Sequence, residues 1–379
     1  MIIIVMVIVW LIPTLGLLVT SFRPVQDINT TGWWSVFSER PGGSEYEEFC
    51  AACHGADGAL LANADLSNPT FIETFRRSVQ ISTSFPNEYN GQVHLPEEAQ
   101  PDAEQLAAIL GYLRRESGID NRPIFTISNY IDSLVGYRGS TSYQQDCEEG
   151  ISSSDISCNF LVDLSNPRGM AEAFKNTLIV SIPATIIPLI IAAFAAYAFS
   201  WFHFPGRMWL FALLVGVQIV PLQMTLVPIS RVYLQLGLNS SFLGVWLFHA
   251  GFGLPYAIFL MRNFIGSLPR ELFESVYLDG ASHWTAFYRL ALPLSMPALA
   301  SLAIFQFLWV WNDLLVALVF LTGRTPVLTY QINNLVQSLG GGWHLLTASA
   351  FLSMLLPLIV FFAFQRFFVR GLLAGSVKG

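Results

Sequence analysis

Charged residues are scarce in this 379-residue chain, at 12% of the sequence against 53% hydrophobic residues. An ordinary soluble domain carries about 25% charge, so the composition argues against a soluble globular protein. A basic stripe with interleaved aromatic residues is missing, which disfavours nucleic-acid binding. The pattern G-x-x-x-x-G-K-[ST] is also missing, so we expect the chain itself to bind no nucleotide.

The few charges are distributed unevenly along the chain. Residues 23–175 contain 10 of the 19 basic and 22 of the 26 acidic residues, a net charge of −12, whereas the remainder carries +5. The overall net charge of −7 therefore describes neither part. This division predicts an acidic, water-exposed region within a basic membrane protein.

Long apolar stretches indicate several membrane spans. Six stretches free of Asp, Glu, Lys and Arg are each longer than the roughly 20 residues that a membrane-spanning helix needs. They are Met1–Phe22, Asn176–Gly206, Met208–Ser230, Val232–Met261, Leu290–Asn312 and Thr325–Gln365. The glycine run 340–342 predicts that the last stretch starts with a loop and that its helix begins near Leu345. We predict an all-α fold with six transmembrane helices.

The basic residues outside 23–175 predict the orientation of these spans. With the N-terminus inside, the inner segments hold seven basic residues and the short outer loops two, in agreement with the positive-inside rule. The inner residues are Arg207, Arg262, Arg270, Arg289, Arg366, Arg370 and Lys378, and the outer ones are Arg231 and Arg324. Both termini are then cytoplasmic and residues 23–175 lie outside. The apolar start lacks the basic flank of a signal peptide, which leaves a start further upstream open.

One inner segment, residues 263–297, is longer than the other inner connections and has a helical pattern. Pro269 suits a first helical turn, and Asp279-Gly280 predicts a turn that ends the helix. Apolar residues recur at helical spacing between them, at Leu272, Phe273, Val276 and Tyr277. A second amphipathic piece contains Trp284, Phe287, Tyr288 and Leu292, and we expect Pro293 and Pro297 to stop it. An interfacial helix on the lipid surface is an alternative interpretation.

These residues resemble the "EAA" loop of the permeases of ATP-binding-cassette (ABC) importers. The similarity rests on Glu274, Asp279, Gly280, Ala281, Phe287, Leu292, Pro293 and Pro297, although Ser275 and Val276 replace the two alanines. The segment 311–313 and the C-terminal tail 370–379 look like sugar-importer permeases of the maltose and α-glucoside type. The resemblance extends over residues 1–35 and 123–379.

The resemblance implies a transporter subunit of the bacterial inner membrane rather than an enzyme. In that family the loop forms a coupling helix that docks on a cytoplasmic ATPase, and this assigns coupling to Glu274, Asp279, Gly280 and Ala281. A separate ATPase dimer, a second permease subunit and an external sugar-binding protein are the implied partners, with membrane lipid around the spans.

Asp313 is a charged residue at the outer part of the predicted fifth span. Charged groups inside a membrane are costly and usually face a cavity or a partner. With Trp311 and Asn312 beside it, Asp313 is a candidate sugar contact. An interfacial anchor or a helix-packing hydrogen bond is the alternative. His249 and His344 lie on or beside apolar spans and are interpreted as packing or interfacial residues.

The acidic region contains the sequence Cys50-Ala51-Ala52-Cys53-His54, the C-x-x-C-H pattern of covalent c-type haem attachment. Cys50 and Cys53 would bind the haem vinyl groups and His54 an axial position of the iron. Ser44 and Glu47 form a capping-box pattern before the motif, and residues 101–116 carry an apolar stripe downstream. Residues 36–122 therefore look like a small class I cytochrome c.

The second axial ligand departs from that pattern. Cytochromes c usually supply a Met, but this chain has none between Met6 and Met170. His94 lies near the expected position. Ligation by His94, an open sixth position and a degenerate domain without haem all stay open.

Cys147 and Cys158 lie in the external connector 123–175. An even pair of cysteines in an oxidising compartment predicts a disulfide. The chain is thus divided into a first span (1–35), a cytochrome c-like insert (36–122), the connector and a permease core (176–379). The alternative function is a membrane-anchored c-type cytochrome that transfers electrons, and a third interpretation has the haem redox state gating transport.

Overall fold

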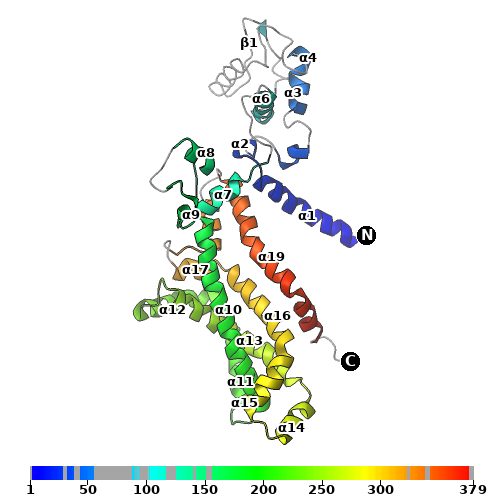
Figure 1. Cartoon of the computed structure of the whole chain (residues 1–379), viewed down its shortest axis with the longest axis vertical. Coiled ribbons are helices and arrows are strands. Elements are labelled where there is room, and N and C mark those ends of the chain that lie inside the picture. Colours follow the sequence, from blue (N-terminus) through cyan, green and yellow to red (C-terminus); the bar gives the residue numbers. More distant parts are fainter. Residues whose placement is uncertain are drawn as a thin grey trace. The chain divides into compact units, whose positions relative to one another are not determined.

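The computed structural model describes residues 2–28, 32–37, 43–54, 88–89, 92–93, 101, 103–116, 125–139, 142–150, 156–321, 325–337 and 342–374. Almost all of these residues lie in helices, which confirms the predicted all-α class (Figure 1). Two short antiparallel strands, β1 (Glu88–Tyr89) and β2 (Gln92–Val93), are the exception among them. The chain divides into two compact units, which are described separately.

The first unit contains residues 1–133, 139–149 and 338–351. Its helices are α1 (Ile2–Ser21), α2 (Val25–Ile28), η1 (Trp33–Phe37), α3 (Gly43–Phe49), α4 (Ala51–His54), α6 (Ala103–Glu116), most of α7 (Ser128–Val135), and α8 (Tyr143–Glu148). The Asn129 amide joins α7 to the end of α1, because it donates to the carbonyls of Ser21 and Arg23 at 2.9 and 2.8 Å.

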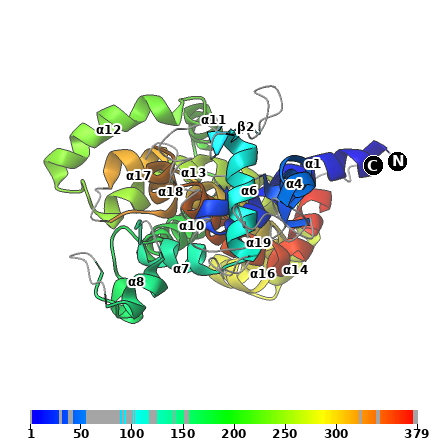
Figure 2. The same cartoon turned by 90° about the horizontal axis from the view of Figure 1, so that it is seen from above.

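The second unit contains the remaining residues and is built on three long helices that pack side by side, α10 (Met170–Trp201), α13 (Phe242–Gly266) and α16 (Leu292–Trp311) (Figure 1). Around them lie α9 (Phe160–Asp163), α11 (Arg207–Val217), α12 (Leu222–Leu236), α14 (Arg270–Leu278), α15 (His283–Ala286), the π-helix η3 (Phe287–Ala291), α17 (Leu315–Phe320) and α18 (Leu328–Gln337). The helix α19 (Trp343–Ala374) begins in the first unit and ends in the second. Seen from above, α12 runs along the outside of this group beside α17 (Figure 2).

The described helices include five that are long and apolar enough to span a membrane, and a sixth span if a bent pair counts as one. The five are Ile3–Ser21, Met170–Trp201, Phe242–Gly266, His283–Trp311 and Trp343–Gln365. The bent pair is α11 and α12, whose axes differ by 98°.

The third and fourth predicted spans are corrected by this geometry. The stretch 208–230 is not one straight helix, because α11 ends at Val217 and Pro221, which precedes α12, lacks an N–H for a continuing ladder. Likewise α12 runs on to Leu236, where Gly237 ends it at a φ of 68°. The next span therefore begins at Phe242 rather than at Val232.

Two further expectations differ from the structure. Residues 328–337 form α18 where a loop was predicted, although α19 begins at Trp343, close to the expected Leu345. Pro293 and Pro297 do not stop the second amphipathic piece, because a continuous span runs from His283 to Trp311. The π-helix directly before Pro293 widens the helix where the proline would disturb the α-helical ladder, which accounts for its tolerance.

Candidate functional sites

The predicted coupling segment folds as a short helix and a turn. The helix α14 begins after Pro269 and ends at Leu278. The N–H groups of Asp279, Gly280 and Ala281 donate to the last carbonyls of the helix at 3.0–3.2 Å. Gly280 has a φ of 80°, a conformation that residues with a Cβ rarely adopt. Both the helix and its glycine-ended turn are as the sequence predicts.

Aromatic contacts fasten α14 to the end of α10. The Phe273 side chain is fully buried and stacks on Trp201, with ring centroids 3.7 Å apart. The Tyr277 hydroxyl lies 3.0 Å from the Tyr197 hydroxyl and 3.0 Å from Nδ1 of His283. The helix is therefore held to α10 by one buried ring and a short polar chain.

The opposite side of α14 is exposed. Leu278 is 88% exposed and Leu272 is 41% exposed, and Glu274 and Asp279 are exposed as well. Within the part of the chain that the structure describes, Glu274 has no hydrogen bond or ion pair. We call the exposed residues Leu272, Glu274, Ser275, Leu278 and Asp279 the α14 outer face. It combines large apolar side chains with a free carboxylate, while Ala281 beside it is half-buried.

The second amphipathic piece joins this region to α16. Phe287 is buried and stacks on Phe194 of α10, with ring centroids 4.7 Å apart. Trp284 packs edge-on against the same ring at 5.8 Å. The same cluster contains Phe273 and residues of α13 and α16. The α14 region is thus part of the core of the second unit.

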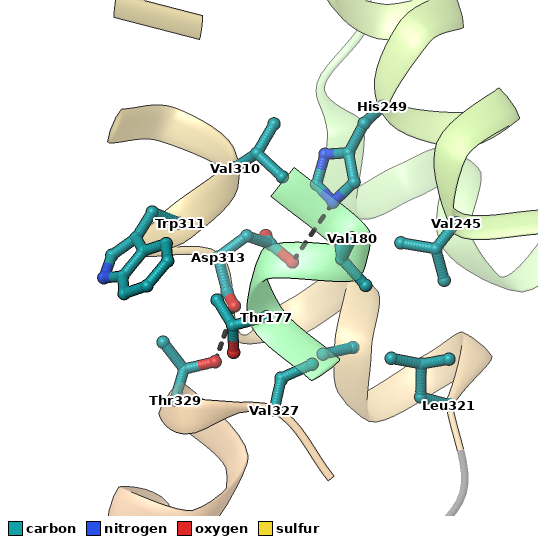
Figure 3. A pocket seen from close by; sticks show the side chains of 11 residues that line it. Thr177, Val180, Val245, His249, Val310, Trp311, Asp313, Leu321, Val327 and Thr329 are labelled. Carbon is teal, nitrogen blue, oxygen red and sulfur yellow. Dashed lines mark hydrogen bonds and ion pairs between the residues drawn. The ribbon is translucent and has the colours of Figure 1, made fainter. Parts of the chain in front are cut away.

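A small cavity of about 10 Å³, room for about one water molecule, lies among α10, α13, α16 and α17, near the other end of α16 (Figure 3). Its lining includes the side chains of Thr177, Val180, Val245, His249, Val310, Trp311, Asp313 and Thr329. Nε2 of His249 lies 3.9 Å from Oδ2 of Asp313. The cavity is therefore apolar apart from a few polar groups, and the only charged side chain in its described lining is Asp313.

The three residues predicted to contact sugar point in different directions. The indole N–H of Trp311 donates to the Ser353 carbonyl at 3.0 Å, and the indole is 2% exposed. The Asn312 amide donates to the carbonyl of Leu308. The carboxylate of Asp313 accepts the N–H of Val316 at 2.9 Å and so caps α17, while the residue also faces the cavity. A hydrogen bond between helices, the alternative interpretation, is therefore present at Trp311, whereas Asn312 bonds within its own helix and Asp313 caps α17.

His249 is the cavity residue that sequence reasoning missed. The residue is 1% exposed, and its ring packs edge-on against Trp309 with ring centroids 5.1 Å apart. His249 is therefore a packing residue, as interpreted from the sequence, and it lines the cavity as well. Its contact with Asp313 joins residues 64 positions apart, which no local spacing reveals. The other histidine of this kind, His344, lies half-buried at the start of α19.

The described part of the insert places its two end helices together. Tyr46 of α3 and Tyr112 of α6 lie 5.1 Å apart, and Cys50 is buried in the same cluster. His54 ends α4 and is 3% exposed. Ser44 does not cap α3 as expected, because it lies within the helix and its hydroxyl donates to Glu45.

The predicted iron site falls largely outside the described residues. His94 and the side chain of Cys53 lie outside them. Among the residues that are described, no group of three or more His, Cys, Asp or Glu gathers in a way that could hold a metal ion. The haem assignment therefore stays a prediction from the motif.

The connector 123–175 contains two disulfide-bonded cysteines and a buried acid. Cys147 and Cys158 are both disulfide-bonded. Asp132 is 4% exposed, and its carboxylate accepts the N–H of Tyr143 at 2.8 Å. Burial, helped by the nearby negative charge of Asp146, raises the pKa of Asp132 to about 7 against the opposing effect of the Tyr143 hydrogen bond.

Several long apolar helices around a small cavity with a few polar side chains, together with the short helix α14 fastened to their ends, define a polytopic membrane permease. The model of the family "Binding-protein-dependent transport system inner membrane component" matches residues 176–373, more than half of the chain. The chain belongs to this family of ABC importer permeases, whose members are transporter subunits rather than enzymes.

Three relatives show how far the similarity extends. The α-glucoside transport system permease protein AglG of Rhizobium meliloti is 39% identical over 391 residues, which cover 99% of this chain and 95% of that protein. The osmoprotective compounds uptake permease protein GgtD of Synechocystis is 60% identical over 218 residues, 57% of this chain and 73% of that protein. A probable ABC transporter permease of Pyrococcus horikoshii is 39% identical over 222 residues, 58% of this chain and 80% of that protein.

These similarities identify the chain as a multi-pass inner-membrane permease subunit of an ABC importer of the sugar-transport type. The match to AglG includes residues 36–175, since it covers 99% of the chain. A counterpart of residues 36–175 therefore accompanies the permease core in that relative.

Proposed function

We propose that this permease imports α-glucosides or related oligosaccharides. The observation that carries the proposal is the match along nearly the whole chain to an α-glucoside permease, external region included. The test reconstitutes the permease with its ATPase, second permease subunit and sugar-binding protein and measures ATP-dependent uptake of labelled maltose and trehalose. Uptake of other solutes but of neither disaccharide would refute the substrate class.

The same proposal includes an orientation and a set of partners. Both termini and α14 lie on the cytoplasmic side, because the basic residues Arg207, Arg262, Arg270 and Arg289 then lie inside. The partners are a cytoplasmic ATPase dimer, a second permease subunit and an external sugar-binding protein. Cysteine labelling from either side of the membrane, at an introduced cysteine in 263–297, checks the orientation.

Coupling to ATP hydrolysis is assigned to the α14 outer face together with Gly280 and Ala281. An exposed apolar helix face suits a groove on a partner protein, and Glu274 is available for a basic partner. The exposure of Leu278 supports this proposal, because such a side chain gains from burial against a protein surface.

The first test of coupling is Gly280→Val. A Cβ at Gly280 meets no atom within 4 Å, so only the φ of 80° opposes the substitution. Strain of about 1–2 kcal/mol then acts on the turn at the edge of the docking surface. We expect ATP-driven uptake to fall while the amount of membrane-inserted protein stays near wild type.

Gly237→Val is the matched control for this test. Gly237 also has a positive φ, of 68°, and open space around its Cβ, but it ends α12. Equal loss of uptake in the two variants would mean that strain alone, and not the position beside α14, affects transport. Normal uptake with Gly280→Val would contradict the coupling assignment.

The solute path is assigned to the end of α16, with Trp311, Asn312 and Asp313 at or beside the cavity. Trp311 and Asp313 line it, whereas Asn312 lies next to them in the chain. Polar side chains inside a membrane bundle usually face a cavity or a pathway, and Asp313 and His249 face this one. The side-chain hydrogen bonds of Trp311 and Asn312 support a structural contribution beside any contact with solute.

The external insert is assigned a covalently bound haem c. Cys50 and Cys53 would hold the macrocycle and His54 the iron, with His94 as the sixth ligand, and the bound haem would supply one-electron transfer. The buried Cys50 and His54 beside the packed helices α3 and α6 fit a site closed to water. The purified protein from a host that attaches haem should give a pyridine haemochrome spectrum.

The matched control for the haem test is the double variant Cys50→Ser and Cys53→Ser, which should lack the covalent signal. No covalent haem in the wild-type protein would refute this part of the proposal and leave the permease assignment unaffected. Deletion of residues 36–122 then shows whether sugar uptake depends on the insert.

A further inference from the structure

The cavity at the end of α16 contains one buried nitrogen that has no partner among the described residues. Nδ1 of His249 has no hydrogen bond there, although the residue is 1% exposed. Its other nitrogen, Nε2, faces the Asp313 carboxylate across 3.9 Å, as Figure 3 shows. This separation exceeds the 2.7–3.2 Å that a direct hydrogen bond requires. Neither ring nitrogen of His249 thus has a hydrogen bond among the described residues, although buried polar groups are almost always paired. Nε2 is the nitrogen that faces Asp313, so it is the one available to a ligand in the cavity.

The other polar side chains of the cavity are already occupied. The Thr177 hydroxyl donates to a carbonyl of its own helix at 2.8 Å and accepts the N–H of Leu328 at 2.9 Å. The Thr329 hydroxyl donates to the backbone carbonyl of Asp313 at 2.7 Å. The indole N–H of Trp311 is bonded outside the cavity, to Ser353. His249 and Asp313 therefore remain for a ligand, with Oδ2 of Asp313 already accepting the N–H of Val316 at 2.9 Å and offering a remaining lone pair.

We propose that His249 and Asp313 form a contact site for a hydroxyl group of the neutral, polyhydroxylated solute. A neutral imidazole can donate from one nitrogen and accept at the other, and a carboxylate accepts. A hydroxyl oxygen placed roughly 2.8 Å from both Nε2 and Oδ2 fits their separation, donating to Asp313 and accepting from His249. The proposal rests on the proposed function, which supplies a solute of this chemistry.

The cavity around the pair has a volume of about 10 Å³, which is room for one hydroxyl group rather than for a whole sugar ring. Val180, Val245 and Val310 form apolar walls around the two polar side chains. Ligand sites typically combine such walls with a few polar groups that fix the orientation of the ligand. The pair also joins α13 to the junction between α16 and α17, so a bound solute would touch more than one helix.

The test uses the complete importer in proteoliposomes with saturating external binding protein. Because that protein captures the solute first, a contact inside the membrane should appear in the maximal uptake rate rather than in KM. Maltose and trehalose place their hydroxyl groups differently, so loss of one hydroxyl contact changes the ratio of their maximal rates. With His249→Phe we expect a change of about threefold to tenfold in this ratio.

Two further variants separate a solute contact from packing. His249→Gln keeps a donor and an acceptor, and its ratio should lie close to that of the wild type. Phe248→Leu alters a buried neighbour on α13 that does not line the cavity. It should leave the ratio of the maximal uptake rates of maltose and trehalose unchanged, whether or not the rates themselves fall. Equal losses for both sugars with His249→Phe would overturn the proposal.

The proposed function and this inference fail in different ways. If the wild-type importer moves neither disaccharide, the substrate class is wrong. If the wild type transports both and His249→Phe leaves the ratio unchanged, the substrate class stands and the contact site is refuted.

Discussion

The buried carboxyl group of Asp132 makes the stability of the connector 123–175 depend on pH. Asp132 is 4% exposed and is held against α8 by the N–H of Tyr143. Burial raises the pKa of Asp132 from 3.8 to about 7, because the charged form loses its water. The perturbation that tests this is Asp132→Asn, which keeps an oxygen to accept the Tyr143 N–H and removes the titration.

The magnitude follows from the difference between the two pKa values. Because the folded-state pKa is the higher one, this group's contribution to stability is fully present below pH 3.8 and is lost as pH rises through about 7. A rise of about 3 pKa units corresponds to about 4 kcal/mol, of which about 3 kcal/mol is lost between pH 5 and 8. Asp132→Asn should remove this part of the pH dependence.

The assay compares thermal unfolding of the full-length protein in detergent at pH 5 and pH 8. We expect the midpoint temperature of unfolding to fall more between pH 5 and pH 8 in the wild type than in Asp132→Asn. Asp146→Asn should give an intermediate fall, because the negative charge of Asp146 contributes to the raised pKa of Asp132. Identical pH dependence in the wild type and Asp132→Asn would refute the reasoning.

Three further substitutions test the packing of the second unit. Phe273→Ala removes the ring that stacks on Trp201, at a cost of about 3–5 kcal/mol, and should expose 263–297 to proteases, whereas Phe273→Leu should not. Gly169→Ala should lower the unfolding midpoint strongly, because its Cβ would lie 2.3 Å from the Leu134 carbonyl oxygen; an unchanged midpoint would contradict this. Trp311→Phe removes the N–H that donates to the Ser353 carbonyl and should lower the free energy of unfolding by about 1 kcal/mol. An unchanged free energy of unfolding would show that this hydrogen bond does not stabilise the fold.

Features that depend on local pattern were predictable from the sequence. The helix α14 follows from a proline, an apolar periodicity and an Asp-Gly pair, and each of these acts within a few residues. The spans α10 and α13 follow from hydropathy, apart from the early start assigned to the latter. Composition alone predicts these elements because burial in a membrane requires only length and low charge.

Features that depend on direction or on distant contacts were not predictable. Hydropathy measures how apolar 208–230 is, but not that the chain turns by 98° before Pro221. Proline rules predict a helix end at Pro293, and only the π-helix before it shows why the span continues. The approach of His249 to Asp313 depends on how α13 packs against α16, which no spacing within either helix encodes.

The unbroken helical path from His283 to Trp311 connects the two candidate sites mechanically. It contains 29 residues, so it is about 43 Å long at 1.5 Å per residue. If it moves as a rigid rod about its end at α15, a tilt of 5° displaces the end at Trp311 by about 4 Å. That displacement is as large as the 3.9 Å between His249 and Asp313. A small rotation next to α14 is therefore enough to make or break the polar contact at the far end of the bundle.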